Sequence, residues 1–384
     1  MLSKRVSEVS ESATVSMSNL AAKMKSEGKE IINFGIGEPD FQTPPGIIDY
    51  AFQKAKEGFT HYTPSKGYAE LRKGIIGSLN IDQNSKITHE NVIVTPTKFA
   101  INLSYLSIAD AGDEIIIPEP YFLSYPEIGN LYGIKPVGVR SNDDFSLNME
   151  NIQDAITPKT KGIIISNPAN PTGKVYSREQ IKQLQKLCID EDIYLITDQI
   201  YEKLVYEGTI QNPFEIDPEM EHTILISGFS KSYAMTGWRI GYMISNQELI
   251  KAADKFQQQT VTCAPSISQM AAIQALKDRE SPEKMREVFQ KRLEKVVSMI
   301  EEIDGLKLNR PEGAFYVFPE YDLNLSSVEF CQKALEKKGL ILTPGSVFGS
   351  QGEKHFRISY ATDEHTIEKG MVKLNEFVGE MSKI

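Results

Sequence analysis

The sequence has little cysteine and tryptophan. Its 384 residues include three cysteines and one tryptophan. The cysteines (Cys188, Cys263 and Cys331) are scattered and form no Cys-x-x-Cys pair, so the sequence indicates neither a disulfide framework nor a zinc site. We therefore expect a chain that works in a reducing cytoplasm and holds no metal.

Long apolar runs and an excess of positive charge are also missing. No apolar run approaches the ~18 residues of a membrane span, and the N-terminal stretch MLSKRVSEVSESATV lacks the apolar core of a signal peptide. The formal net charge of -10 argues against nucleic acid or an anionic membrane as a main partner. A hydrophobic content of 40% with 24% charged residues is ordinary for a globular chain with a sizeable core.

Short apolar segments alternate with helical segments through the middle of the chain. The apolar segments are residues 92–94, 114–117, 135–139, 162–166, 193–197 and 223–227, and residues 178–191 form one of the helical segments. This alternation predicts a mainly parallel sheet with helices on both faces. Ligands bind such sheets at the carboxyl ends of the strands.

The C-terminal third has a different pattern. Two helices are expected at residues 266–277 and 281–303, and the second has the length and apolar spacing of a helix between two domains. Beyond it, the segments PEGAFYVFPEY, GLILTPGSVFG and KHFRISYA predict short strands, joined by a helix over residues 326–338. We therefore expect a second, smaller α+β domain.

Lys231 lies on a predicted turn that follows an apolar strand. The surrounding segment TILISGFSKSYAMTGWRIGYMIS is apolar, aromatic or small at most positions. A lysine in such surroundings loses water, which lowers its pKa and favours the free amine that a nucleophile needs. Arg239 follows eight residues later and offers a planar fork suited to phosphate. The pair indicates an amine that condenses with an aldehyde beside a bound phosphate.

The segment SKSYAMTGWRIGY resembles the lysine segment of the pyridoxal-phosphate aminotransferases of fold type I, class I, and the chain most resembles their aspartate aminotransferase branch. The resemblance extends from SATV to FRIS. It implies a large domain (residues 46–285) with a mainly parallel seven-stranded sheet sandwiched by helices, and a smaller α+β domain (residues 1–45 and 286–384). It further implies pyridoxal 5'-phosphate as the cofactor and a homodimer with shared active sites.

The resemblance assigns the cofactor's aldehyde to Lys231 and its phosphate to Arg239. Gly228 stands where many relatives have a phosphate-binding serine, so Ser230 or a backbone N–H must supply that contact.

Further phosphate contacts are expected from other segments. Thr97 and Lys98 begin a predicted helix, where unpaired N–H groups and the helix dipole favour an anion. Tyr62, in the loop HYTPSKG, is explained by packing on its own. The matching tyrosine of the family reaches the cofactor phosphate of the partner subunit.

Three motifs at strand ends carry the other cofactor contacts. Asp198 ends a buried strand, and a buried aspartate needs a partner such as a helix cap or, as the resemblance implies, the protonated ring nitrogen of the cofactor. The resemblance places Tyr201 and Asn170 at the cofactor's phenolic oxygen and Phe122 against its ring. From the residues alone, Phe122 is explained equally well by core packing, and SNPANPTG by a turn.

Substrate contacts are implied for both ends of the chain. Gly37, in GEPDF, would meet the substrate carboxylate with its backbone, and Asn170 would help to hold the substrate. Arg357, in FRIS, would clamp the α-carboxylate, although a strand arginine more often faces water at a sheet edge. Lys98 would contact a distal carboxylate, and Ser12 and Thr14 of the SATV segment would close over the substrate.

We predict an aminotransferase that moves the amino group of aspartate to 2-oxoglutarate by a ping-pong mechanism. Lys231, Asp198 and Tyr201 are the predicted catalytic residues, with the Lys231 amine as the base. One alternative is an aromatic or broad-range aminotransferase, with Phe122, Tyr62 and Tyr121 lining an apolar pocket. A β-eliminating carbon-sulfur lyase or a cyclising synthase would keep the same core residues. A non-catalytic regulator would need an added nucleic-acid-binding domain, for which the chain has no room.

Overall fold

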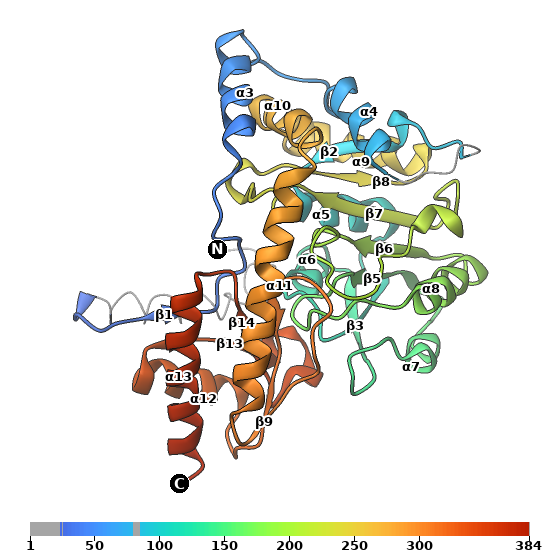
Figure 1. Cartoon of the computed structure of the whole chain (residues 1–384). Helices are drawn as coiled ribbons and strands as arrows, with labels where there is room; N and C mark the ends of the chain where they lie inside the picture. Colours follow the sequence, from blue (N-terminus) through green and yellow to red (C-terminus); the bar gives the residue numbers. More distant parts are fainter. Residues whose placement is uncertain (1–23, 25, 80–84, 384) are drawn as a thin grey trace, which may run out of the picture.

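The computed structural model describes Met24, residues 26–79 and residues 85–383. Its centre is a seven-stranded sheet of order β2-β8-β7-β6-β5-β3-β4 (Figure 1). Strand β8 runs antiparallel to β2 and β7, and the remaining neighbours are parallel, which confirms the predicted sheet. The strands are β2 (Val92–Thr95), β3 (Glu114–Glu119), β4 (Lys135–Arg140), β5 (Thr160–Ser166), β6 (Tyr194–Asp198), β7 (Thr223–Gly228) and β8 (Gly241–Ile244).

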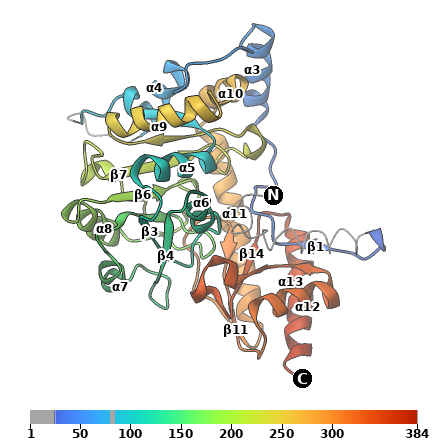
Figure 2. The same ribbon diagram turned by 180° about the vertical axis from the view of Figure 1, so that it is seen from behind.

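Helices cover both faces of this sheet, and β-branched side chains on the inner strands β5, β6 and β7 are buried on both faces, as expected for parallel strands. One apolar cluster joins the sheet to α5 (Thr97–Ile108), α6 (Ser124–Tyr132) and α9 (Gln247–Thr260), which lie in front of the sheet in Figure 2. A second cluster joins the sheet to α3 (Pro45–Lys56), α4 (Ala69–Ser78) and α10 (Ser266–Ala275). A third joins it to α7 (Met149–Asp154) and α8 (Arg178–Asp190).

The C-terminal part forms small sheets around a second core. The long helix α11 (Glu280–Glu301) runs from the large sheet to this core (Figure 1). The other elements are helices α12 (Ser327–Lys338) and α13 (Glu364–Met381) and strands β9 (Leu306–Lys307), β10 (Tyr316–Val317), β11 (Glu320–Tyr321), β12 (Leu340–Ile341), β13 (Thr343–Pro344) and β14 (Phe356–Ser359). Strand β1 (Ile32–Asn33), from the N-terminal part, pairs with β12. Short 3-10 helices lie at His89–Asn91, Pro213–Glu215, Thr236–Trp238, Gly345–Phe348 and Ser350–Gly352.

The ends of several predicted elements shift by one or two residues for local reasons. Ser326 caps α12 rather than beginning it, because its side chain accepts from the Glu329 N–H in a capping box. Ile193 lies before β6, where its N–H donates to Cys188 O at the end of α8. None of the described helices has the length and apolar character needed to cross a membrane.

Arg357 lies in the central strand of a three-stranded sheet of order β10-β14-β13. Its side chain is buried. The edge position, which a strand arginine more often takes, is therefore wrong for this residue. The neighbouring strands instead place the guanidinium toward the carboxyl ends of the large sheet, where β5, β6 and β7 end side by side.

Candidate active site

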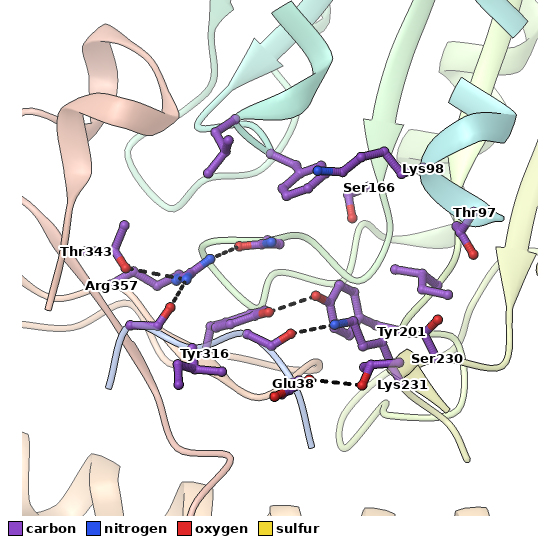
Figure 3. A pocket seen from close by; sticks show the side chains of 18 of the residues that line it. Glu38, Thr97, Lys98, Ser166, Tyr201, Ser230, Lys231, Tyr316, Thr343 and Arg357 are labelled. Atoms are coloured by element: carbon purple, nitrogen blue, oxygen red, sulfur yellow. Dashed lines mark hydrogen bonds between the residues drawn. The ribbon is translucent and has the colours of Figure 1, made fainter. Parts of the chain in front are cut away.

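A cavity of about 540 Å³ lies between the carboxyl ends of the large sheet and the small three-stranded sheet. Figure 3 shows side chains from both sides turned toward it. Among the described residues that were predicted for the site, all but Tyr62 line it: Gly37, Thr97, Lys98, Phe122, Asn170, Asp198, Tyr201, Ser230, Lys231, Arg239 and Arg357.

Asp198 is the last residue of β6 and is buried. Burial raises the pKa of its carboxyl to about 6, although hydrogen bonds to the Tyr125 hydroxyl and the Ile200 N–H oppose that rise. The Tyr125 oxygen lies 3.0 Å from Oδ2, and the Ile200 nitrogen lies 3.1 Å from Oδ1. A buried carboxyl with a raised pKa gains from a cationic N–H partner, such as a protonated pyridine ring.

Lys231 lies on the turn after β7, as its flanking residues predict. Burial is the main cause that lowers the pKa of its amine to about 8. The charges of Arg357 and Arg239 act in the same direction, whereas those of Glu38 and Asp198 oppose it. The amine donates a hydrogen bond to the Gly37 carbonyl. At pH 7 about a tenth of this amine is therefore unprotonated, far more than of an ordinary lysine, and the unprotonated form is the one that a nucleophile or a proton-accepting base requires.

Thr97 begins α5 and points its hydroxyl toward the end of β7. The Oγ1 atom is buried and has no hydrogen-bond partner among the described residues. A Cβ atom at Gly228 would lie 2.6 Å from this oxygen, and one at Gly241 would lie 2.3 Å from it. Glycine at 228, a departure from the serine of many relatives, therefore leaves room for the Thr97 hydroxyl. This hydroxyl and the free N–H groups of the helix start form a donor set suited to phosphate.

Two cations complete this corner of the cavity. Arg239 has a left-handed backbone (φ 54°), and its Nη1 donates to Thr236 O at 2.9 Å. Lys98 has its Nζ atom 5.5 Å from the centre of the Phe122 ring. Burial lowers the pKa of Lys98, and the charge of Arg239 adds to that effect. Ser230, buried in the turn before Lys231, lines the same corner.

Arg357 is held from several sides. Nη1 donates to Asn170 Oδ1 at 3.0 Å, and Nη2 donates to Gly35 O at 2.8 Å. The Nε atom is buried and has no hydrogen-bond partner within the described ranges. A fixed guanidinium with an unused donor is a suitable binding group for a carboxylate.

Tyr201 lies on the turn after β6, beside Asp198. Its hydroxyl oxygen lies 2.8 Å from that of Tyr316, and both side chains are buried. Sequence reasoning missed Tyr316 and Tyr125. Tyr125 lies in the first turn of α6 and Tyr316 stands among other buried residues of GAFYVF, so only their contacts with distant residues distinguish them from core tyrosines.

The remaining predicted residues have different placements. Tyr62 is 88% exposed and does not line the cavity, so any contact it makes with a cofactor would be in another subunit. Tyr121 packs against the core beside α6 and also does not line the cavity. Ser12 and Thr14 lie outside the described residues.

Comparison with known proteins agrees with this geometry. The sequence profile of the family described as "Aminotransferase class I and II" matches residues 29–374. The chain belongs to this family. It is 39% identical to an aspartate aminotransferase of Bacillus subtilis, over 99% of this chain and 100% of the relative. Like other members, it is a pyridoxal-phosphate-dependent aminotransferase.

Two further relatives show the spread of substrates. A (5-formylfuran-3-yl)methyl phosphate transaminase of Methanocaldococcus jannaschii is 40% identical, over 99% of this chain and 100% of the relative. An aspartate aminotransferase of Thermus thermophilus, solved with maleate, has a TM-score of 0.92 and 35% identity, over 98% of this chain and 99% of the other. Identity alone therefore does not decide the substrate.

The residues of the cavity fit pyridoxal 5'-phosphate. The unpartnered Thr97 hydroxyl, the start of α5 and Arg239 offer donors to a phosphate at one corner. Asp198 offers a carboxyl to a ring nitrogen, and Phe122 offers an aromatic face. Lys231 offers the amine that would bind the aldehyde.

Proposed function

We propose that this aminotransferase moves the amino group of aspartate to 2-oxoglutarate in a ping-pong cycle. The observation that carries the proposal is a pair of cations on different walls of one cavity, Arg357 and Lys98 (Figure 3). A dicarboxylic amino acid has a carboxylate for each of them. The aspartate aminotransferases among the relatives support the same substrate class.

The roles of the site residues follow from their surroundings. When bound, pyridoxal phosphate supplies an electron sink for the electrons of the substrate's Cα–H bond. Once the substrate's amine has displaced it from the cofactor, the Lys231 amine, with its lowered pKa, would be the base that takes the Cα proton and passes it to the cofactor's C4' carbon. Asp198 holds the ring nitrogen of the cofactor, and Tyr201 and Asn170 donate to its phenolic oxygen.

Other residues of the cavity bind the substrate and the cofactor phosphate. Arg357 binds the α-carboxylate, with Asn170 and the Gly37 backbone beside it, and Lys98 binds the distal carboxylate. Thr97, Ser230 and Arg239 hold the cofactor phosphate, and Phe122 stacks on the ring. Exclusion of water from this buried site strengthens each charged contact.

We also propose a larger arrangement for the whole chain. Residues 46–285 form a large domain, and residues 1–45 with 286–384 form a small one. Two chains form a cytoplasmic homodimer in which Tyr62 completes the phosphate site of the partner subunit. The 88% exposure of the Tyr62 side chain supports this arrangement, because a tyrosine ring so exposed gains from a partner surface.

The alternatives receive less support. Of the aromatic residues suggested for an apolar pocket, Phe122 lines the cavity of its own subunit and Tyr121 does not. The loss of Tyr121 from the pocket argues against an enzyme specific for aromatic amino acids. A carbon-sulfur lyase would use the same core residues, and its products, ammonia and pyruvate, distinguish it from a transaminase.

The role of Lys231 is tested by chemical reduction. Borohydride treatment of the enzyme with bound cofactor should attach the cofactor to Lys231 alone, because this amine is half-buried in the cavity and its pKa is lowered. Peptide mass mapping locates the label. The Lys231→Ala variant serves as the control and should take up no label, and a label on any other lysine would overturn the assignment.

The substrate is tested by steady-state kinetics with aspartate, glutamate, phenylalanine and tyrosine. We expect the wild type to prefer aspartate, and Lys98→Met to lower kcat/KM for aspartate by about ten- to a hundredfold, the effect of one lost charge-assisted hydrogen bond. The matched control is Lys86→Met, which removes an exposed lysine paired with Glu219. A preference for phenylalanine, or an unchanged aspartate value in Lys98→Met, would contradict the proposal.

A further inference from the structure

Tyr316 contacts both Tyr201 and Arg357, the two groups to which we assign the cofactor's phenolic oxygen and the substrate carboxylate. Its hydroxyl oxygen lies 2.8 Å from that of Tyr201, and the guanidinium carbon of Arg357 lies 4.5 Å from the centre of its ring. We propose that Tyr316 is a positioning residue of transamination, whose hydroxyl directs the Tyr201 O–H and whose ring fixes the Arg357 plane. This inference rests on the proposed function of that site.

The hydroxyl part of the proposal follows from counting protons. A phenol has one proton to donate. If Tyr201 donated to Tyr316, it would have no proton left for an acceptor in the cavity. When Tyr316 donates to Tyr201, the Tyr201 proton is free to point into the cavity. The Arg357 guanidinium beside the Tyr316 ring is a donor only, and Tyr201 is the hydrogen-bond partner that the structure gives to the Tyr316 hydroxyl, so Tyr201 is the natural acceptor for the Tyr316 proton.

Gly37 supports this arrangement from the other side. A Cβ atom at Gly37 would lie 2.5 Å from the Tyr316 hydroxyl oxygen. Any other residue at position 37 would push the hydroxyl away from Tyr201 or move the GEPDF segment. The Tyr316 hydroxyl is therefore a steric reason for glycine at position 37, separate from any backbone contact between Gly37 and the substrate.

The ring part of the proposal rests on how Arg357 is held. Its guanidinium carbon lies 4.5 Å from the Tyr316 ring centre and 5.1 Å from that of Phe348, so aromatic groups contact it at two places. Strand pairing fixes the partners, because Tyr316 lies opposite Ser359 and Arg357 is two residues from Ser359. Hydrogen bonds from Nη1 and Nη2 then set the rotation of the plane.

Three variants separate the two parts. Tyr316→Phe removes the hydroxyl and keeps the ring, whereas Tyr316→Leu removes both. The matched control is Tyr360→Phe, which removes the hydroxyl of another buried tyrosine, one that donates to Ala314 O away from the cavity. For each holoenzyme we would measure the pH titration of the cofactor's visible absorbance, the Kd for maleate as an unreactive dicarboxylate, and kcat and KM.

For Tyr316→Phe we expect the titration midpoint to rise by about half a pH unit and kcat to fall about three- to tenfold. The midpoint rises because Tyr201, without the Tyr316 hydroxyl, makes a weaker hydrogen bond to the cofactor's phenolic oxygen. More negative charge then stays on that oxygen, and it raises the pKa of the Lys231 nitrogen that is bound to the cofactor. Its maleate Kd should stay within about twofold of the wild-type value. Tyr316→Leu should in addition weaken maleate binding about tenfold. Tyr360→Phe should match the wild type in all three.

The outcomes that would overturn the inference are separate for each part. A wild-type titration midpoint and kcat in Tyr316→Phe would overturn the hydroxyl part. Equal maleate affinity in Tyr316→Phe and Tyr316→Leu would overturn the ring part. A further variant, Arg357→Lys, separates a failure of this inference from a failure of the proposed function. Unchanged maleate binding in Arg357→Lys would show that Arg357 does not bind the carboxylate. The pH titration of Tyr316→Phe would still decide the hydroxyl part.

Discussion

Asp198 illustrates how a single residue serves function at a cost in stability. Its carboxyl is buried, and the two hydrogen bonds from Tyr125 and the Ile200 N–H do not bring its pKa down to the ordinary value. Because its pKa is raised, the folded chain holds the proton of this carboxyl more strongly than the unfolded chain does. Folding stability from this group is therefore greatest at low pH and is lost as the pH rises through about 6.

The Asp198→Asn variant should change both the folding stability and the catalytic rate. Without cofactor, we expect it to be more stable than the wild type above pH 7, by about 1 to 3 kcal/mol, because asparagine cannot ionise. With cofactor, kcat should fall by a large factor, because a neutral amide does not hold a proton on the ring nitrogen. Urea unfolding at pH 5 and pH 8 and steady-state kinetics provide the measurements. A near-normal kcat would contradict the electrostatic role.

Among the elements, the start of α5 and the end of β7 form one unit. The Thr97 side chain occupies the space that Gly228 and Gly241 leave open, and a Cβ atom at Gly228 would also lie 2.8 Å from the Gly241 Cα atom at the start of β8. The phosphate corner therefore depends on three backbone segments and on glycine at two of them. A serine at 228 would meet both Thr97 Oγ1 and the Gly241 backbone.

Removal of the Thr97 hydroxyl should weaken cofactor binding. We expect Thr97→Ala to raise the cofactor Kd by about tenfold, the effect of a lost hydrogen bond to a charged group. Thr97→Ser keeps the oxygen and is the matched control, with a Kd close to the wild-type value. Both are measured by reconstitution of the apoenzyme with cofactor. Equal affinities of the two variants would show that the hydroxyl does not contact the phosphate.

The sequence predicts the elements better than it predicts contacts between them. The strands of the large sheet are recognisable because their residues are apolar on both faces, and the structure moves only their ends. The edge position for Arg357 is wrong because a single strand does not show its neighbours. Tyr125 and Tyr316 were missed for a related reason, since their hydroxyls meet Asp198 and Tyr201, which are 73 and 115 residues away.

At the scale of the whole molecule, the segment of residues 35–41 joins parts that are far apart in the sequence. Gly35 O accepts from Arg357, and Asp40 makes two hydrogen bonds to Arg292 of α11, at 2.7 and 2.9 Å. The Arg292 guanidinium lies 5.4 Å from the Phe41 ring centre and 5.5 Å from that of Phe289. The position of this segment therefore depends on the long helix as well as on the site.

The shared site of the proposed dimer is tested by mixing inactive variants. Lys231→Ala and Tyr62→Ala each impair both sites of their own homodimer. A heterodimer has one site with both residues intact, so we expect about half of the wild-type activity per heterodimer. The matched control mixes Lys231→Ala with Asp198→Asn, since these residues come from the same subunit and no site is restored. Verified heterodimers without recovered activity would contradict sharing.

The contacts around Gly228 also limit which residues this position can accept during evolution. A side chain there would meet the Thr97 hydroxyl and the Gly241 backbone at once, so loss of the Thr97 side chain alone would not make room for it. A change to serine at 228 therefore needs a shift of the β7 or β8 backbone as well, and we expect chains with this backbone to keep the glycine whichever residue occupies position 97.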